Sequence, residues 1–190
     1  MGVPIRNPEP MTGEEFFAFT ETRPDEERWE LIDGEPILNA SPHHLHQQIV
    51  RNLIVAFAYV EKAQKVEWRL IPGIAVATSK IDAPVPDLLI RPARPLDSWI
   101  CSDALVIFEI LSPSTADRDL RWKRKAYASL PSLQHYVVIA QDSAEIAVYD
   151  RSSGFAERRI ASLAGSLDLA TLGVSVPLSE IYAGTGLKDG

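Results

Sequence analysis

The 190-residue sequence lacks features that mark several large classes of protein. A single cysteine, Cys101, excludes an intrachain disulfide framework and is typical of a reducing compartment. No segment approaches the roughly 20 consecutive apolar residues of a membrane-spanning helix. Residues 1–10 are polar and rich in proline, without the apolar core of a signal peptide. We therefore expect a cytoplasmic protein that has no membrane partner.

Familiar catalytic and nucleotide-binding motifs are also missing. The chain contains no G-x-S-x-G, no G-x-G-x-x-G and no P-loop, and Cys101 has no evident partner for nucleophilic work. The net charge of −7 argues against broad, nonspecific affinity for nucleic acid. Carboxylates gathered around a metal ion would lower the same sum, so the charge does not exclude a specific nucleic-acid enzyme.

The remaining composition is that of a globular chain, with 46% apolar and 24% charged residues and no internal repeat. Helical and strand-like segments alternate, which predicts an α/β (α+β) fold with a mixed sheet. We expect a flexible arm (1–10), one domain (11–183) and a frayed tail (184–190). Helices are predicted from Thr12, from Ser41-Pro42 to Lys62, over 117–129 and over 177–182. Strands are predicted at 29–38 (a hairpin turning at Asp33-Gly34), 66–70, 73–77, 85–90, 104–111, 135–140, 145–150 and 155–161.

One carboxylate stands out within a strand that is apolar on both faces. Residues 104–111 (ALVIFEIL) read as a strand covered on both sides, and Glu109 lies near its end. An unpaired buried charge costs several kcal/mol or more. The carboxylate therefore requires a proton, a basic partner or a metal ion.

The helix that follows supplies a basic partner. At about 100° per residue, Leu120, Lys123, Tyr127 and Leu130 fall on one face, so Lys123 lies within the inward stripe. Asp87, in the short strand 85–90, is a second carboxylate at a strand terminus. Pro86 beside it favours an edge strand or a strand start.

Other polar residues are candidates for a supporting shell. His46 lies beside the apolar stripe of the long helix, where it borders a pocket or caps the helix start. His43 and His44 are close, but no cysteine is near and zinc is not expected. Glu30 and Glu35 are candidates for a supporting carboxylate or simply exposed charges. Five basic residues between 118 and 125, among them Arg118, Arg121 and Arg124, form either a solvated helix face or a phosphate-facing patch.

Two strand-end carboxylates and an inward lysine have a known chemical use. Carboxylate oxygens are the ligands of hard cations such as Mg²⁺ or Mn²⁺. Such a cation polarises a phosphoryl oxygen and activates water, while the lysine orients the water or neutralises developing charge. The set Asp87, Glu109 and Lys123 therefore predicts metal-dependent phosphodiester hydrolysis. A buried Glu109–Lys123 ion pair braced by Asp87 is the structural alternative.

The chain resembles the restriction-endonuclease-like family of small bacterial proteins, within the PD-(D/E)xK nuclease superfamily. The matching segments span about residues 11–183: 30–35 (ELIDGE), His46 with Ile49 and Leu53, 86–88 (PDL), 109–115 (EILSPST), Asp119-x-x-x-Lys123-x-x-x-Tyr127, 130–137 (LPSLQHYV) and 176–182 (VPLSEIY).

This resemblance implies a restriction-endonuclease-like fold, a central mixed sheet flanked by helices, and a Mg²⁺-dependent site of Asp87, Glu109 and a lysine that cleaves DNA, in double-stranded form. Leu111 stands where the superfamily places its lysine, and Lys123 matches the family's displaced position on the next helix. Asp119 and Tyr127 belong to the same matched segment. A duplex has two strands to cut, which is compatible with a homodimer. A noncatalytic nucleic-acid-binding or protein-interaction module on this scaffold is the alternative function.

Overall fold

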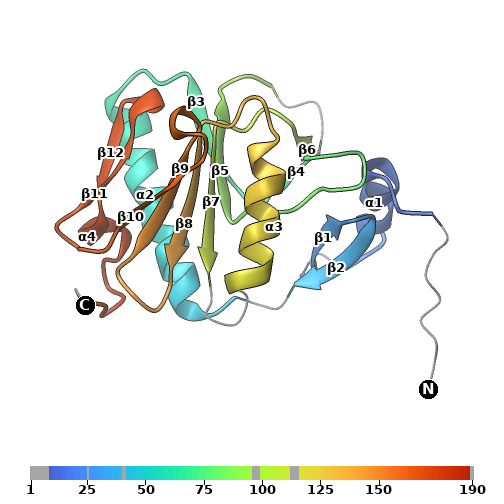
Figure 1. Cartoon of the computed structure of the whole chain (residues 1–190), viewed down its shortest axis with the longest axis horizontal. Coiled ribbons are helices and arrows are strands. Elements are labelled where there is room, and N and C mark those ends of the chain that lie inside the picture. Colours follow the sequence, from blue (N-terminus) through green and yellow to red (C-terminus); the bar gives the residue numbers. More distant parts are fainter. Residues whose placement is uncertain (1–8, 25, 40–41, 96–98, 112–115, 189–190) are drawn as a thin grey trace.

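The chain folds around one mixed sheet that is covered on both faces (Figure 1). The computed structural model describes residues 9–24, 26–39, 42–95, 99–111 and 116–188, with only the backbone described for 116–120. No helix in these ranges is long and apolar enough to cross a membrane.

The central sheet has six strands in the order β10-β9-β8-β7-β5-β3. Their bounds are β3 Trp68–Pro72, β5 Leu88–Pro92, β7 Val106–Leu111, β8 His135–Ala140, β9 Ile146–Asp150 and β10 Glu157–Ile160. β7 and β8 run parallel, and every other neighbouring pair is antiparallel. The predicted mixed sheet is therefore confirmed. β7 lies between β5 and β8, so the strand that carries Glu109 is central.

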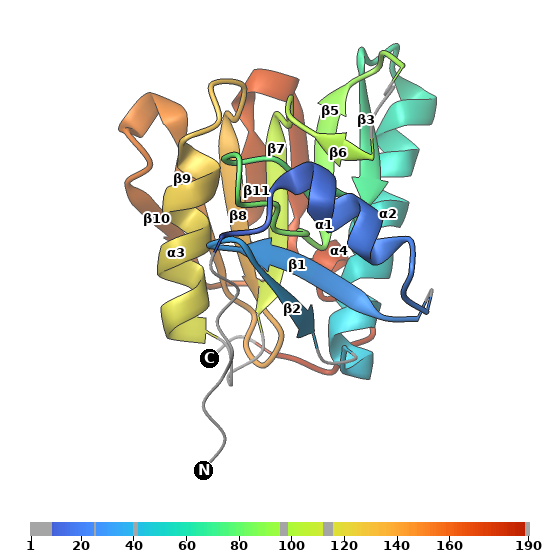
Figure 2. The ribbon, with the colours of Figure 1, turned by 90° about the vertical axis from the view of Figure 1, so that its right-hand side faces the viewer.

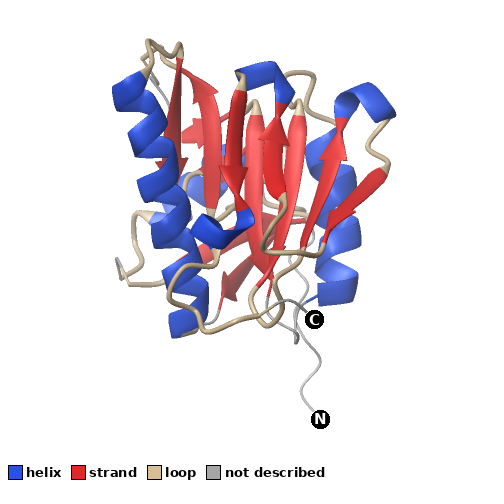
Figure 3. Ribbon diagram, turned by 90° about the vertical axis from the view of Figure 1, so that its left-hand side faces the viewer, coloured by secondary structure: helices blue, strands red, loops and turns tan. Residues whose placement is uncertain are grey.

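The two faces of the sheet are covered by different elements. Figure 3 shows helix α2 (His44–Ala63), helix α4 (Leu178–Ile181) and the hairpin of β11 (Ser166–Leu169) and β12 (Val174–Pro177) on one face. On the opposite face, Figure 2 shows helix α3 (Ala116–Ala128), helix α1 (Gly13–Thr20) and the hairpin of β1 (Arg28–Ile32) and β2 (Glu35–Asn39). Because side chains of a strand alternate, Phe108 and Ile110 pack toward α2, while Ile107 and Glu109 face α3 and the β1–β2 hairpin.

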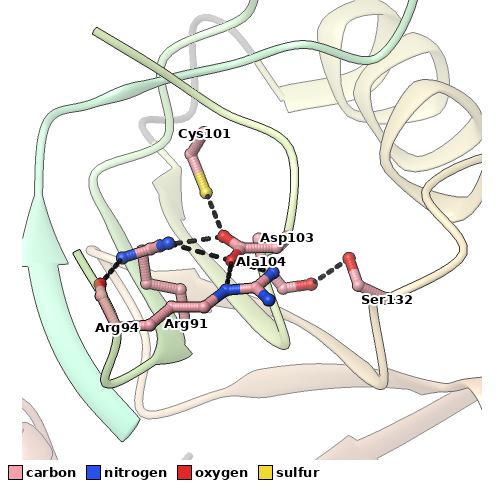
Figure 4. Close-up of polar contacts among 6 residues, drawn as sticks. All are labelled: Arg91, Arg94, Cys101, Asp103, Ala104 and Ser132. Atoms are coloured by element: carbon pink, nitrogen blue, oxygen red, sulfur yellow. Dashed lines mark hydrogen bonds and ion pairs between the residues drawn. The ribbon is translucent and has the colours of Figure 1, made fainter. Parts of the chain in front are cut away.

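An ion-pair cluster joins the end of β5 to the segment before β7 (Figure 4). The buried Arg91 donates to both carboxylate oxygens of Asp103 at 2.8 and 2.9 Å, and Arg94 donates to Oδ2 of the same group. Burial would raise the pKa of the Asp103 carboxyl, but the hydrogen bonds from the two arginines outweigh it and hold the pKa at about 2. Next to it, Ser132 donates to the Ala104 carbonyl oxygen at 2.8 Å. The cluster ties β5 and β7 together at one end.

Most predicted elements are present, and four details differ. The capping box of Thr12 and Glu15 and the turn at Asp33-Gly34 are confirmed. The predicted helix start at Ser41-Pro42 is wrong, because His43 is the N-cap; Ser41 itself lies outside the described residues. The strand predicted at 85–90 begins at residue 88. Of the two positions that Pro86 favours, the sheet edge is wrong, because β5 pairs on both sides, whereas Pro86 does lie just before the start of the strand. The hairpin β11–β12 was not predicted, because its strands are only four residues long and the segment 167–176 has no clear alternation.

A further short parallel pair joins β4 (Ala75–Val76) to β6 (Ile100–Cys101). The sequence analysis expected a longer strand, 73–77, in place of β4.

Candidate active site

The pairing of β5 with β7 brings the two predicted carboxylates together. Leu88 pairs with Phe108 in this antiparallel ladder, so Asp87, one residue before β5, reaches the level of Glu109. The backbone N–H of Ile110 donates to Oδ2 of Asp87 at 2.7 Å. This bond fixes the aspartate against the strand that carries the glutamate.

Lys123 of α3 lies between two carboxylates. Its Nζ is 3.1 Å from Oε1 of Glu109 and 2.8 Å from Oε1 of Glu30. The side chain is 14% exposed, and the two glutamates are more deeply buried. Helical periodicity therefore predicted the inward orientation of Lys123 correctly. Arg121 and Lys125, which lie off that inward face of the helix, are exposed.

Two further contacts hold the glutamates in place. The Tyr127 hydroxyl, one turn after Lys123 on α3, donates to Oε1 of Glu109 at 2.9 Å. Both Lys123 and Tyr127 thus engage the same oxygen of Glu109, which orients the carboxylate. Oε1 of Glu30 also accepts from the Val85 backbone N–H at 2.9 Å. Glu30 is therefore anchored both to the helix and to the segment that leads to Asp87.

His46 approaches the cluster from α2, across the plane of the sheet. Its Nε2 lies 3.0 Å from Oδ1 of Asp87, so both oxygens of that carboxylate have partners. The second ring nitrogen of His46, Nδ1, and the hydroxyl of Tyr136 on β8 are both buried, and neither has a hydrogen-bond partner among the described residues. Buried polar groups of this kind are rare in proteins and usually meet water or a ligand.

Burial and charge control the ionisation of the central pair. Burial raises the pKa of the Glu109 carboxyl to about 7; Lys123 opposes this increase, and the negative charges of Asp87 and Glu30 add to it. Burial would lower the pKa of Lys123, but attraction by Glu109 and Glu30 outweighs it, so the pKa lies above its ordinary value. At neutral pH the lysine is therefore a cation, and Glu109 is close to its midpoint of ionisation.

The residues fit a hard divalent cation. Glu109 on β7 and Asp87, just before the neighbouring strand β5, offer oxygen ligands, and Mg²⁺ is commonly bound through one or two carboxylates completed by water and substrate phosphates. Three carboxylates share the site with Lys123, which contacts Glu30 and Glu109, and with His46, which contacts Asp87. In the described ranges, no three His, Cys, Asp or Glu side chains form a metal-holding group by themselves.

Several predicted residues lie elsewhere. Glu35 is exposed on β2 and is not part of the cluster, so of the two glutamates of the hairpin only Glu30 contacts it. Arg121 is exposed, and the Arg124 guanidinium lies over the Tyr149 ring, 5.2 Å from its centroid. The side chains of Arg118 and Asp119 lie outside the described part of the structure. The sequence analysis did not identify Tyr136 or the backbone donors of Val85 and Ile110; a buried tyrosine in an apolar strand was the one available signal.

Comparison with known proteins agrees with this architecture. A family model described as "putative restriction endonuclease" matches residues 14–179. A search of curated proteins finds no match. The chain is similar in structure to a crystal structure titled a putative nuclease belonging to DUF820, from Anabaena variabilis. The TM-score is 0.75 at 16% sequence identity, over 93% of this chain and 99% of the other, which shows a shared fold. Because the family model covers most of the chain, the protein belongs to the putative restriction endonuclease family.

Proposed function

We propose that the protein is a metal-dependent endonuclease that hydrolyses phosphodiester bonds of DNA. The observation that carries the proposal is that Asp87, just before β5, lies level with Glu109 on the neighbouring strand β7, beside the inward Lys123. Two of the neighbouring carboxylates, Glu30 and Glu109, are buried and share one cation, Lys123, and a buried carboxylate is costly unless its charge is neutralised. Membership of the family and the nuclease title of the structural neighbour support the same reaction class.

In this proposal the protein groups divide the work. Asp87 and Glu109 would hold Mg²⁺ or Mn²⁺, which when bound polarises the phosphoryl group and lowers the pKa of water. Lys123, a cation at neutral pH, orients the attacking water or stabilises charge that develops on phosphorus. Tyr127 fixes the orientation of Glu109, and His46 and the Ile110 N–H fix that of Asp87. Glu30 holds Lys123 in position.

A cleavage assay tests the proposal. Supercoiled plasmid is incubated with Mg²⁺ or Mn²⁺ and with wild type, Glu109→Gln or Glu35→Gln. The last variant is a matched control, because Glu35 is an exposed glutamate on the hairpin that also carries Glu30. We expect metal-dependent nicking by wild type and Glu35→Gln, and a loss of about 100-fold or more in Glu109→Gln, as for other groups that stabilise a transition state.

Two results would contradict the proposal. Equal nicking by Glu109→Gln would show that the activity does not come from this site. Binding of DNA by the wild type without cleavage under any divalent cation would favour the alternative, a noncatalytic nucleic-acid-binding module. Then Glu109 and Lys123 would be a structural ion pair.

A further inference from the structure

Three tyrosine rings lie side by side between α3 and the central sheet. The ring centroids of Tyr127 on α3 and Tyr136 on β8 are 5.4 Å apart, and Tyr136 stacks on Tyr149 of β9 at 5.7 Å. All three side chains are buried. Tyr136 is the middle ring, so its neighbours on both sides hold it in one position.

The three hydroxyls differ in their partners. Tyr127 donates to Oε1 of Glu109 at 2.9 Å, and Tyr149 donates to Oε2 of Glu157 at 2.7 Å. The Tyr136 hydroxyl is buried and has no hydrogen-bond partner among the described residues. A buried hydroxyl without a partner costs free energy, and such groups usually meet ordered water or a ligand. The hydroxyl of Tyr136 is therefore available to a molecule outside the chain.

The strand register relates this hydroxyl to the candidate active site. In the parallel pairing of β7 with β8, Ile107 lies opposite Tyr136 and Glu109 lies opposite Val138, so Tyr136 and Glu109 share the face covered by α3. Burial is the main cause that raises the pKa of the Tyr136 hydroxyl, and the negative charges of Glu109 and Asp87 raise it further. The hydroxyl therefore lies within electrostatic reach of both carboxylates that we propose as cation ligands.

Water at the proposed cation site is the partner that suits this hydroxyl. Mg²⁺ usually keeps several waters when one or two carboxylates bind it. Lys123 and Tyr127 both donate to Oε1 of Glu109, so neither bond occupies Oε2. Tyr136 is only 1% exposed, which excludes direct contact with a polynucleotide but not with a water molecule. An uncharged hydroxyl can bind such a water without repelling the cation, as a second lysine would.

We propose that Tyr136 is a positioning residue whose hydroxyl holds a water of the cation site at Asp87 and Glu109. This inference rests on the proposed function, because it requires a cation at these two carboxylates. Tyr136 acts through the water and does not touch the substrate. Loss of an outer partner of this kind typically lowers metal affinity by about 10–100-fold.

Tyr136→Phe tests the role of the hydroxyl, because it keeps the ring between Tyr127 and Tyr149. Mn²⁺ affinity is measured by calorimetric titration at pH 8, and thermal unfolding is followed in EDTA and with Mn²⁺. We expect the variant to bind Mn²⁺ about tenfold more weakly than the wild type. In EDTA it should unfold at a temperature no lower than the wild type, since no protein hydrogen bond is lost. Mn²⁺ should then raise its melting temperature by less.

Tyr149→Phe is the matched control. It removes a hydroxyl from the neighbouring buried ring, where the hydroxyl has a protein partner, Glu157. Loss of that hydrogen bond should lower the melting temperature in EDTA by about 2–4 °C and leave Mn²⁺ affinity at the wild-type value. The two variants are thus expected to differ in opposite ways, which a general loosening of the packed rings would not produce.

The outcomes separate this inference from the proposed function. Equal Mn²⁺ affinity in Tyr136→Phe and the wild type would overturn the role of Tyr136 and leave the cation site standing. Equal losses of affinity in Tyr136→Phe and Tyr149→Phe would also overturn it, because the effect would then come from ring packing. Absence of Mn²⁺ binding to the wild type would refute the cation site and this inference together.

Discussion

The raised pKa of Glu109 predicts an unusual dependence of stability on pH. A carboxyl with a pKa of about 7 in the folded state and an ordinary value of 4.5 when unfolded binds its proton more tightly when folded. Its contribution is therefore fully present below pH 4.5 and is lost progressively as the pH rises to about 7. At 1.36 kcal/mol for each pKa unit, the loss is on the order of 3 kcal/mol.

Glu109→Gln isolates this effect, because the amide has the same shape and does not titrate. Its oxygen can still accept from Lys123 and Tyr127. Urea denaturation of both proteins in EDTA, at pH steps from 5 to 8, gives the free energy of unfolding. We expect the wild type to lose on the order of 3 kcal/mol relative to the variant across this range. Lys123 does not contribute to this change in stability. Its pKa is raised above its ordinary value of 10.5, so the lysine stays protonated throughout this pH range.

Parallel pH profiles for the two proteins would refute this reasoning. They would mean that Glu109 is ionised in the folded protein throughout the range, with its charge already neutralised by Lys123. A matched measurement with Mg²⁺ extends the test, since a bound cation favours the ionised carboxylate. The decline in wild-type stability should then shrink, whereas Glu109→Gln should respond less to the cation.

Three further predictions concern the site and its supports. Lys123→Met leaves Glu30 and Glu109 buried without their shared cation and should destabilise the protein by about 3 kcal/mol or more in urea denaturation. Asp103→Asn should lower stability by about 2 kcal/mol at pH 7, and by less as the pH falls through 3.8 toward 2, while Mn²⁺ affinity stays at the wild-type value. Gly34→Ala should cost about 1–3 kcal/mol, seen as a lower melting temperature, because φ is +74° and the new Cβ would lie 2.3 Å from Cβ of Pro10. In each case, a loss of stability less than half as large as predicted would contradict the stabilising role given to that residue.

The sequence predicts the lysine better than the second carboxylate, for a physical reason. The position of Lys123 follows from helical periodicity, which depends only on the residues of one helix. The approach of Asp87 to Glu109 depends on the register between β5 and β7, and a shift of one residue would turn every side chain to the other face. That register is fixed by contacts far along the chain, among them the Arg91–Asp103 cluster.

The supporting residues illustrate the same limit. Glu30 and Glu35 flank one turn and look alike in sequence, yet one is buried against Lys123 and the other is exposed. The difference comes from which strand of the hairpin lies inward, a tertiary choice that local alternation does not encode. His46 reaches Asp87 from a helix on the opposite face, so no spacing rule joins them. The Arg124 side chain, predicted for DNA, stacks on Tyr149 because the neighbouring strands place that ring beneath α3.

The most direct test of the central claim, that Asp87 and Glu109 form a cation site, is a calorimetric titration with Mn²⁺ at pH 8. The wild type is compared with Asp87→Asn and with Asp168→Asn, a control aspartate on the exposed side of β11. We expect saturable binding by the wild type and the control, and a loss of affinity of about tenfold or more in Asp87→Asn, since a neutral amide is a weaker ligand than a carboxylate. Absence of Mn²⁺ binding to the wild type, or equal affinity in Asp87→Asn, would contradict the account and leave the buried cluster as a structural ion pair.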